Sequence, residues 1–211
     1  MPMFPTEVLL AYLAAVLLVI VAPGPDNILA LSRALSQGRG AGVLSSIGAG
    51  LGIMFHTVAA ALGLAIVLQT SPIAFWIVKA VGATYLVWLG YKAISSRSLI
   101  SFIPAERHSL ARVFTTGFLS NVLNPKPGLF VIAFIPQFTS PARGSVAIQM
   151  LVYGALFAVL TAVIFAVLAC FAAQLSQWLS RRPRVVAAAN VGAGLTFIAA
   201  GLSILVLGRR Q

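Results

Sequence analysis

The chain has 211 residues, of which 60% are hydrophobic and only 8% are charged. Soluble domains carry about 25% charged residues, so this composition excludes a soluble fold and predicts an integral membrane protein. The net charge is +11, but most basic residues stand in short loops between apolar stretches, which indicates topology signals rather than nucleic-acid binding. The single cysteine, Cys170, excludes an internal disulfide and a dithiol relay.

Six apolar stretches follow one another along the chain, each long enough for a membrane helix of about 20 residues. They cover residues 8–35, 43–68, 73–94, 113–138, 145–175 and 185–207. Together they predict an all-α polytopic membrane protein with a single transmembrane domain over residues 1–211. No phosphate-binding loop occurs in the sequence, and we expect no enzymatic activity, no cofactor and no metal.

Basic loop residues concentrate after the first, third and fifth stretches, whereas Arg143, Arg209 and Arg210 lie on the other side. Under the positive-inside rule the richer side faces the cytoplasm, so we expect both termini outside. A five-span topology is the alternative, and it would place the two termini on opposite sides of the membrane.

The first stretch is interrupted at "APGPDN", which contains Pro23, Gly24, Pro25, Asp26 and Asn27. Each proline removes a backbone N–H and frees the carbonyl four residues earlier. Such groups are costly in hydrocarbon and must face protein, water or a ligand. Asp26 and Asn27 are residue types that cap the resumed half-helix. A proline kink with a structural cap is the simpler interpretation of this segment alone.

The fourth stretch is interrupted in the same way at "NVLNPKPGLF", where Pro125 and Pro127 flank Lys126. Asn121 and Asn124 precede this break and are expected either to satisfy freed carbonyls or to contact a solute. The two breaks together carry opposite charges, on Asp26 and Lys126. Ionisable residues inside membrane spans usually mark functional sites, and this pair would suit a zwitterion.

The two breaks also suggest an internal repeat, because Pro23 aligns with Pro125 and Pro25 with Pro127, while "VGATYL" resembles the later "VGAGLT". We predict two three-helix repeats, over about residues 6–95 and 112–208. Three spans is an odd number, so the second repeat would enter the membrane inverted. Inverted repeats with broken helices at matching positions are typical of secondary transporters.

Four segments, "APGPDN", "QGRGAGVLSSIGAGLG", "VGATYLVWLGYKAI" and "NVLNPKPGLF", resemble the LysE/RhtB family of bacterial amino-acid exporters in content and order. The resemblance covers nearly the whole chain. It implies a multi-pass protein of the bacterial plasma (inner) membrane that exports amino acids or close analogues, driven by the proton gradient. It does not specify the amino acid.

The expected mechanism is alternating access around a midplane site between the two breaks. Asp26 is the candidate proton carrier, because burial favours its neutral form. His56 is a second candidate, since histidine titrates near neutral pH, and a packing histidine is equally compatible. It continues a stripe of small residues through Gly48 and Gly52 that predicts a helix–helix contact or a homodimer. Lys79 either extends to the membrane surface or pairs with Asp26.

Two other functions remain open. A metal or cation exporter would need several converging ligands, and the spans offer only Asp26, His56 and Cys170. A non-transporting membrane assembly subunit would use the proline breaks for structure alone.

Overall fold

The computed structural model describes residues 2–22, 24–70, 72–95 and 106–206, and all regular structure within them is helical. In chain order the elements are α1 (Thr6–Val21), α2 (Pro25–Gln37), α3 (Arg39–Thr70), α4 (Pro72–Ser95), α5 (Leu110–Leu123), α6 (Pro125–Ala133), η1 (Ile135–Phe138), η2 (Pro141–Arg143), α7 (Val146–Cys170), α8 (Ala172–Ser180) and α9 (Pro183–Val206). The all-helical class is therefore confirmed.

Both predicted helix breaks are present. The axes of α1 and α2 differ by 56°, and those of α5 and the α6–η1 segment differ by 52°. Pro25 and Pro125 are the first residues of α2 and α6, where a missing N–H removes no intrahelical bond and the fixed φ suits the helix. Pro23 lies outside the described residues.

Two helices in the described ranges are long and apolar enough to cross a bilayer, namely α7 and the Arg39–Gly63 part of α3. Each of the two bent pairs would supply one further span, and Arg184–Ala199 within α9 forms a shorter apolar helix. The structure thus supports a membrane protein with two to four spans by length and composition, while the six-span count remains a prediction.

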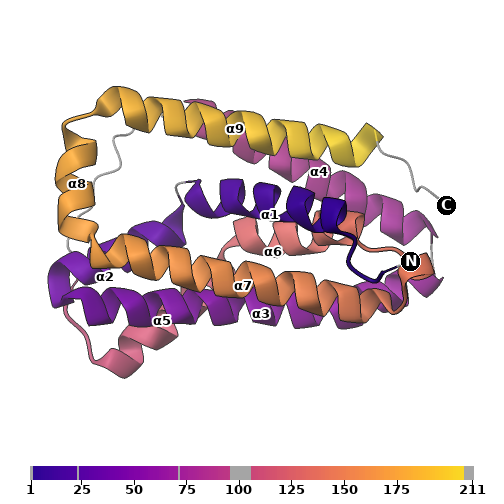
Figure 1. Cartoon of the computed structure of the whole chain (residues 1–211), viewed down its shortest axis with the longest axis horizontal. Coiled ribbons are helices and arrows are strands. Elements are labelled where there is room, and N and C mark those ends of the chain that lie inside the picture. The colour runs from indigo at the N-terminus through magenta and orange to yellow at the C-terminus, as the bar shows by residue number, and fades with distance from the viewer. Residues whose placement is uncertain (1, 23, 71, 96–105, 207–211) are drawn as a thin grey trace.

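The fifth apolar stretch ends earlier than predicted. We expected it to continue to Leu175, but α7 ends at Cys170 and α8 follows across the end of the bundle (Figure 1). Polar side chains explain the change, because Gln174, Ser176 and Gln177 fall within one short segment. Such side chains are disfavoured in hydrocarbon, so this segment lies beyond the apolar part of the bundle.

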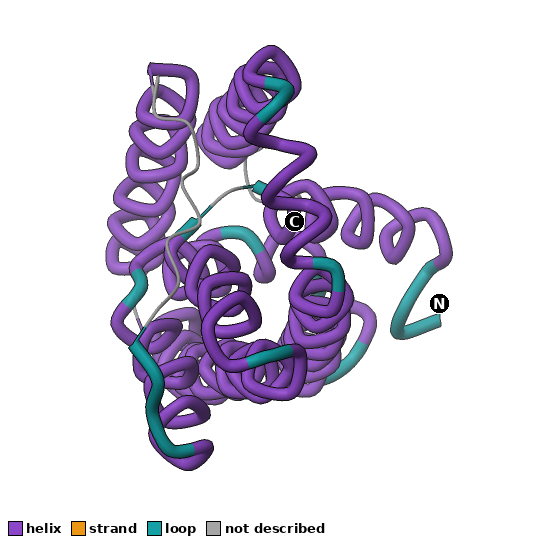
Figure 2. The backbone as a smooth tube through the Cα atoms, turned by 90° about the vertical axis from the view of Figure 1, so that its left-hand side faces the viewer, coloured by secondary structure: helices purple, strands orange, loops and turns teal. Residues whose placement is uncertain are grey.

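The start of α1 and the end of α9 lie at the same end of the bundle, opposite α8 and the α2–α3 turn (Figure 1). At that turn Gly38 has a φ of 92°, a left-handed conformation that glycine adopts without strain. Most helices run side by side when viewed along the bundle from the α8 end (Figure 2). Which end faces the cytoplasm stays a prediction.

Small residues bring the helices close together, as the predicted stripe on α3 requires. A Cβ on Gly48 would lie 2.5 Å from the Phe114 carbonyl oxygen of α5, and one on Gly52 would lie 2.6 Å from Asn121 Cβ. Across the bundle, a Cβ on Gly154 of α7 would lie 2.1 Å from Thr57 Cγ2 of α3. The predicted stripe therefore forms contacts inside the bundle, and the homodimer remains an untested alternative.

Candidate functional site

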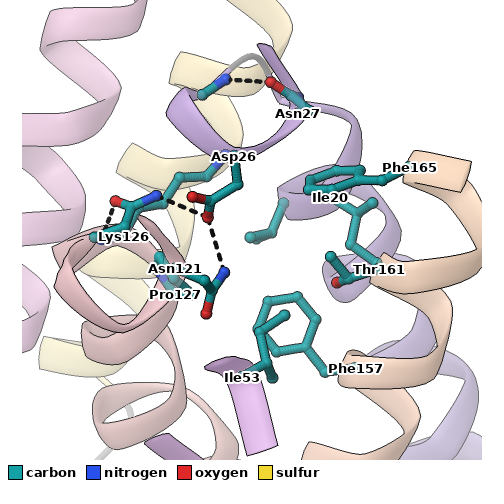
Figure 3. A pocket seen from close by; sticks show the side chains of 13 residues that line it. Ile20, Asp26, Asn27, Ile53, Asn121, Lys126, Pro127, Phe157, Thr161 and Phe165 are labelled. Atoms are coloured by element: carbon teal, nitrogen blue, oxygen red, sulfur yellow. Dashed lines mark hydrogen bonds between the residues drawn. The ribbon is translucent and has the colours of Figure 1, made fainter. Parts of the chain in front are cut away.

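The two helix breaks meet in the middle of the bundle and share side chains. The Asp26 carboxylate of α2 accepts three hydrogen bonds from the end of α5 and the following break (Figure 3). Ser120 Oγ donates at 2.8 Å, Asn121 Nδ2 at 2.8 Å and Asn124 Nδ2 at 3.0 Å. Asp26 is only 8% exposed, so this contact anchors the first break to the second.

A reciprocal contact runs from the second break to the first. Lys126 Nζ donates to the carbonyl oxygen of Ala22, at the end of α1, at 2.9 Å. Asn27 Nδ2 donates to the same oxygen at 3.2 Å. In this conformation the protein's own ammonium therefore occupies a backbone carbonyl of the first break. Each break therefore supplies the polar partners that the other needs.

The caps of the resumed helices differ from the prediction. Neither Asp26 nor Asn27 is the N-cap of α2, because Pro25 begins the helix and Gly24 occupies the cap position. Asn27 instead reaches back, and its Oδ1 accepts a hydrogen bond from Gly24 N at 2.9 Å. In the second break Asn124 is the N-cap of α6. Because Gly24 and not Asp26 caps α2, the Asp26 carboxylate is available to accept hydrogen bonds from α5.

His56 of α3 lies beside the second break, in contact with residues on both sides of it. Its Nε2 is 3.1 Å from the Asn121 carbonyl oxygen, which is one of the groups that Pro125 was expected to free. Its ring packs against Gly128, where an added Cβ would lie 2.9 Å from His56 Cε1. His56 therefore holds the second break in place and does not line the cavity described next. The side chain of Lys79 lies outside the described residues.

A cavity of about 30 Å³ lies between the breaks. Its polar wall consists of Gly24, Asp26, Asn27, Asn121, Asn124 and Lys126, all of which the sequence predicted as site residues. The predicted residue Pro127 lines it as well, whereas Pro25 and Pro125 are exposed and begin their helices. Opposite charges on the two ionisable residues give this wall no net charge. The volume has room for about two water molecules.

The opposite wall is mainly apolar and was not predicted. Phe157, Thr161 and Phe165 project from one face of α7 (Figure 3), and the wall is completed by Val19 and Ile20 of α1 and Ile53 of α3. The sequence carries only a weak signal for this face, because most side chains of α7 are apolar. Gln149, Tyr153 and Thr161 follow one another at multiples of four residues and mark the same helix face.

Comparison with known proteins gives matches over nearly the whole chain. The profile of the LysE type translocator family matches residues 17–208. An uncharacterized membrane protein of Vibrio cholerae is 31% identical over 197 residues, covering 93% of this chain and 95% of that protein. The homoserine/homoserine lactone efflux protein of Salmonella typhimurium is 30% identical over 192 residues, covering 90% and 92%. No solved structure gives a significant match.

Proposed function

Because the chain belongs to the LysE type translocator family, we propose that it exports amino acids or close amino-acid analogues across the bacterial plasma membrane. The name of the Salmonella typhimurium relative, a homoserine/homoserine lactone efflux protein, supports this substrate class. The observation that carries the proposal is the cavity at the meeting point of two helix breaks, with Asp26 and Lys126 on its wall.

A zwitterion fits this wall. Within the described part of the chain, Lys126 Nζ makes one hydrogen bond, to the Ala22 carbonyl, and its ammonium can exchange that partner for the carboxylate of a substrate. The substrate ammonium then meets the Ala22 carbonyl or the Asp26 carboxylate. The exchange leaves the cavity neutral, which matters because an unpaired charge is costly in a low-dielectric site.

The transport cycle is alternating access between two inverted repeats. The packing of the helices supports this arrangement. Helices at equivalent positions of the two predicted repeats contact each other, α3 with α7 and α4 with α9. The cavity is too small for an amino acid in this conformation. Substrate entry therefore requires the wall between α2 and α5 to part, and the three hydrogen bonds of Asp26 join that wall.

Proton coupling follows from the same contact. A carboxylate accepts hydrogen bonds more strongly when it is ionised, so protonation of Asp26 would loosen α2 from α5. His56 acts on the same element, because it bonds the Asn121 carbonyl. We propose that inward proton movement through Asp26, with His56 as the second candidate, drives export.

The two alternatives receive less support. Among the residues that the structure describes, no group of three or more His, Cys, Asp or Glu side chains is placed to hold a metal ion. An assembly subunit would need no charged cavity, and it predicts no solute flux.

Export is tested in two steps. Amino acids excreted by cells with and without the protein identify the substrate, which is then loaded into vesicles containing the purified protein. We expect Asp26→Asn and Lys126→Ala to lose most efflux. Matched controls are Glu7→Gln and Lys92→Ala, at exposed positions, which retain it. If the two site variants export as well as the parent, the proposed site is wrong; if no amino acid is exported, the function is wrong.

A further inference from the structure

One side chain of the cavity, Thr161, has a hydroxyl group without a partner among the residues that the structure describes. Thr161 is 2% exposed, and its Oγ1 makes no hydrogen bond to the described residues. Helical threonines commonly donate to the carbonyl four residues earlier, as Thr57 does to Ile53 at 2.8 Å and Thr115 does to Ala111 at 2.9 Å. Thr161 departs from this pattern, so its hydroxyl is free for another group.

The cavity is the place where that group would lie. Thr161 lines it from α7, between Phe157 and Phe165 on the same helix face, and projects toward its interior (Figure 3). Buried polar groups are normally hydrogen-bonded, and exceptions require an explanation. A ligand that binds in the cavity provides one.

Asn121 on the opposite wall also carries an unpaired atom, but that atom is placed differently. Its Oδ1 lacks a hydrogen-bond partner within the described ranges, and it lies against α3, where a Cβ on Gly52 would be 2.7 Å away. Its Nδ2 donates to Asp26 at 2.8 Å. A hydroxyl both donates and accepts hydrogen bonds, whereas an amide oxygen only accepts them, so the Thr161 hydroxyl is the more versatile of the two unpaired groups.

We propose that Thr161 is a specificity-determining residue that hydrogen-bonds a polar atom on the substrate's side chain. This inference rests on the proposed export of amino acids. Phe157 and Phe165 surround the hydroxyl with apolar surface, so the favoured side chain is small and carries one neutral polar atom. An alkyl side chain of the same shape would leave the Thr161 hydroxyl buried and unpaired, which binding sites discriminate against.

Matched pairs of amino acids test this directly. Threonine and valine differ by a hydroxyl in place of a methyl group, and so do serine and 2-aminobutyrate. Purified protein in liposomes is assayed for counterflow of each amino acid, and the ratio of rates within each pair is compared between variants. For the parent we expect about a tenfold preference for the hydroxyl member, the effect of one hydrogen bond.

The variants separate the hydroxyl from the shape of the side chain. Thr161→Val keeps the shape and removes the hydroxyl, so the preference should fall below about threefold, while Thr161→Ser should retain it. Thr115→Val is the control, because the Thr115 hydroxyl is bonded within its own helix and is exposed. It should leave the ratio unchanged.

Three results would overturn the inference. One is a parent without preference in either pair, another is a preference that Thr161→Val retains, and the third is a protein that carries none of the four amino acids. The first two leave amino-acid export standing. The third removes the export function as well only if the wider amino-acid screen is also negative.

Discussion

Neutralising Asp26 should destabilise the protein mainly through Lys126, not through lost hydrogen bonds. In Asp26→Asn the new amide oxygen can accept from Asn121 and Asn124, and the new amide group can donate to the Ser120 hydroxyl, which turns to accept. All three contacts of Asp26 therefore persist in neutral form. The carboxylate charge is lost, and Lys126, which lies on the same cavity wall as Asp26, is left unbalanced.

The size of the effect follows from that imbalance. Asp26 and Lys126 bond to other groups and not to each other, so their attraction is weaker than in a direct ion pair, and Asp26→Asn should lower the free energy of unfolding by about 1 to 2 kcal/mol. Lys126→Gln should cost about 1 to 2 kcal/mol, because Asp26 keeps three hydrogen-bond donors. The double variant contains no unbalanced charge, and it should be more stable than the sum of the single effects by about 1 kcal/mol.

Reversible unfolding of the purified protein in detergent, followed by circular dichroism during titration with sodium dodecyl sulfate, measures these free energies. Ser120→Ala is the matched control, because it removes one hydrogen bond to Asp26 and leaves both charges. It should cost about 0.6 to 1 kcal/mol and add to Lys126→Gln without coupling. If Asp26→Asn and Lys126→Gln also add, to within about 0.5 kcal/mol, the two charges do not balance each other and the argument fails.

Two further predictions concern a contact between two helices and a contact between a helix and a loop. In Gly52→Ala the added Cβ would lie 2.6 Å from Asn121 Cβ, so α3 and α5 must separate; we expect a loss of about 2 kcal/mol in unfolding free energy and slower efflux. Gly40→Ala, where the Cβ meets open space, is its control, and equal stability of the two variants would contradict the prediction. Gln37→Ala removes two hydrogen bonds to the backbone of His108, of 2.7 and 2.9 Å, so amide hydrogen exchange at residues 106–109 should accelerate while α3 and α7 remain protected. Unchanged exchange there would show that this contact does not hold the segment.

The helix breaks and the membrane class were predictable because both depend on local chemistry. Proline lacks an N–H wherever it stands, so the prolines of the two motifs predicted the two breaks. The charged pair was also visible, since Asp26 and Lys126 are ionisable residues within apolar stretches. The exact cap was not predictable, because Gly24, Asp26 and Asn27 are all acceptable cap residues and only the observed backbone assigns the role to Gly24.

Tertiary structure decided what each polar group contacts. Asp26 receives its donors from α5, about a hundred residues later in the chain, and Lys126 reaches back to Ala22; no local pattern specifies partners at that separation. The cavity wall formed by Phe157, Thr161 and Phe165 was hidden for a different reason. In a membrane helix, apolar side chains are favoured both where they face lipid and where they line an apolar cavity wall. The sequence of α7 therefore indicates apolar surroundings, and only the packing of the helices shows which side chains meet lipid and which meet the cavity.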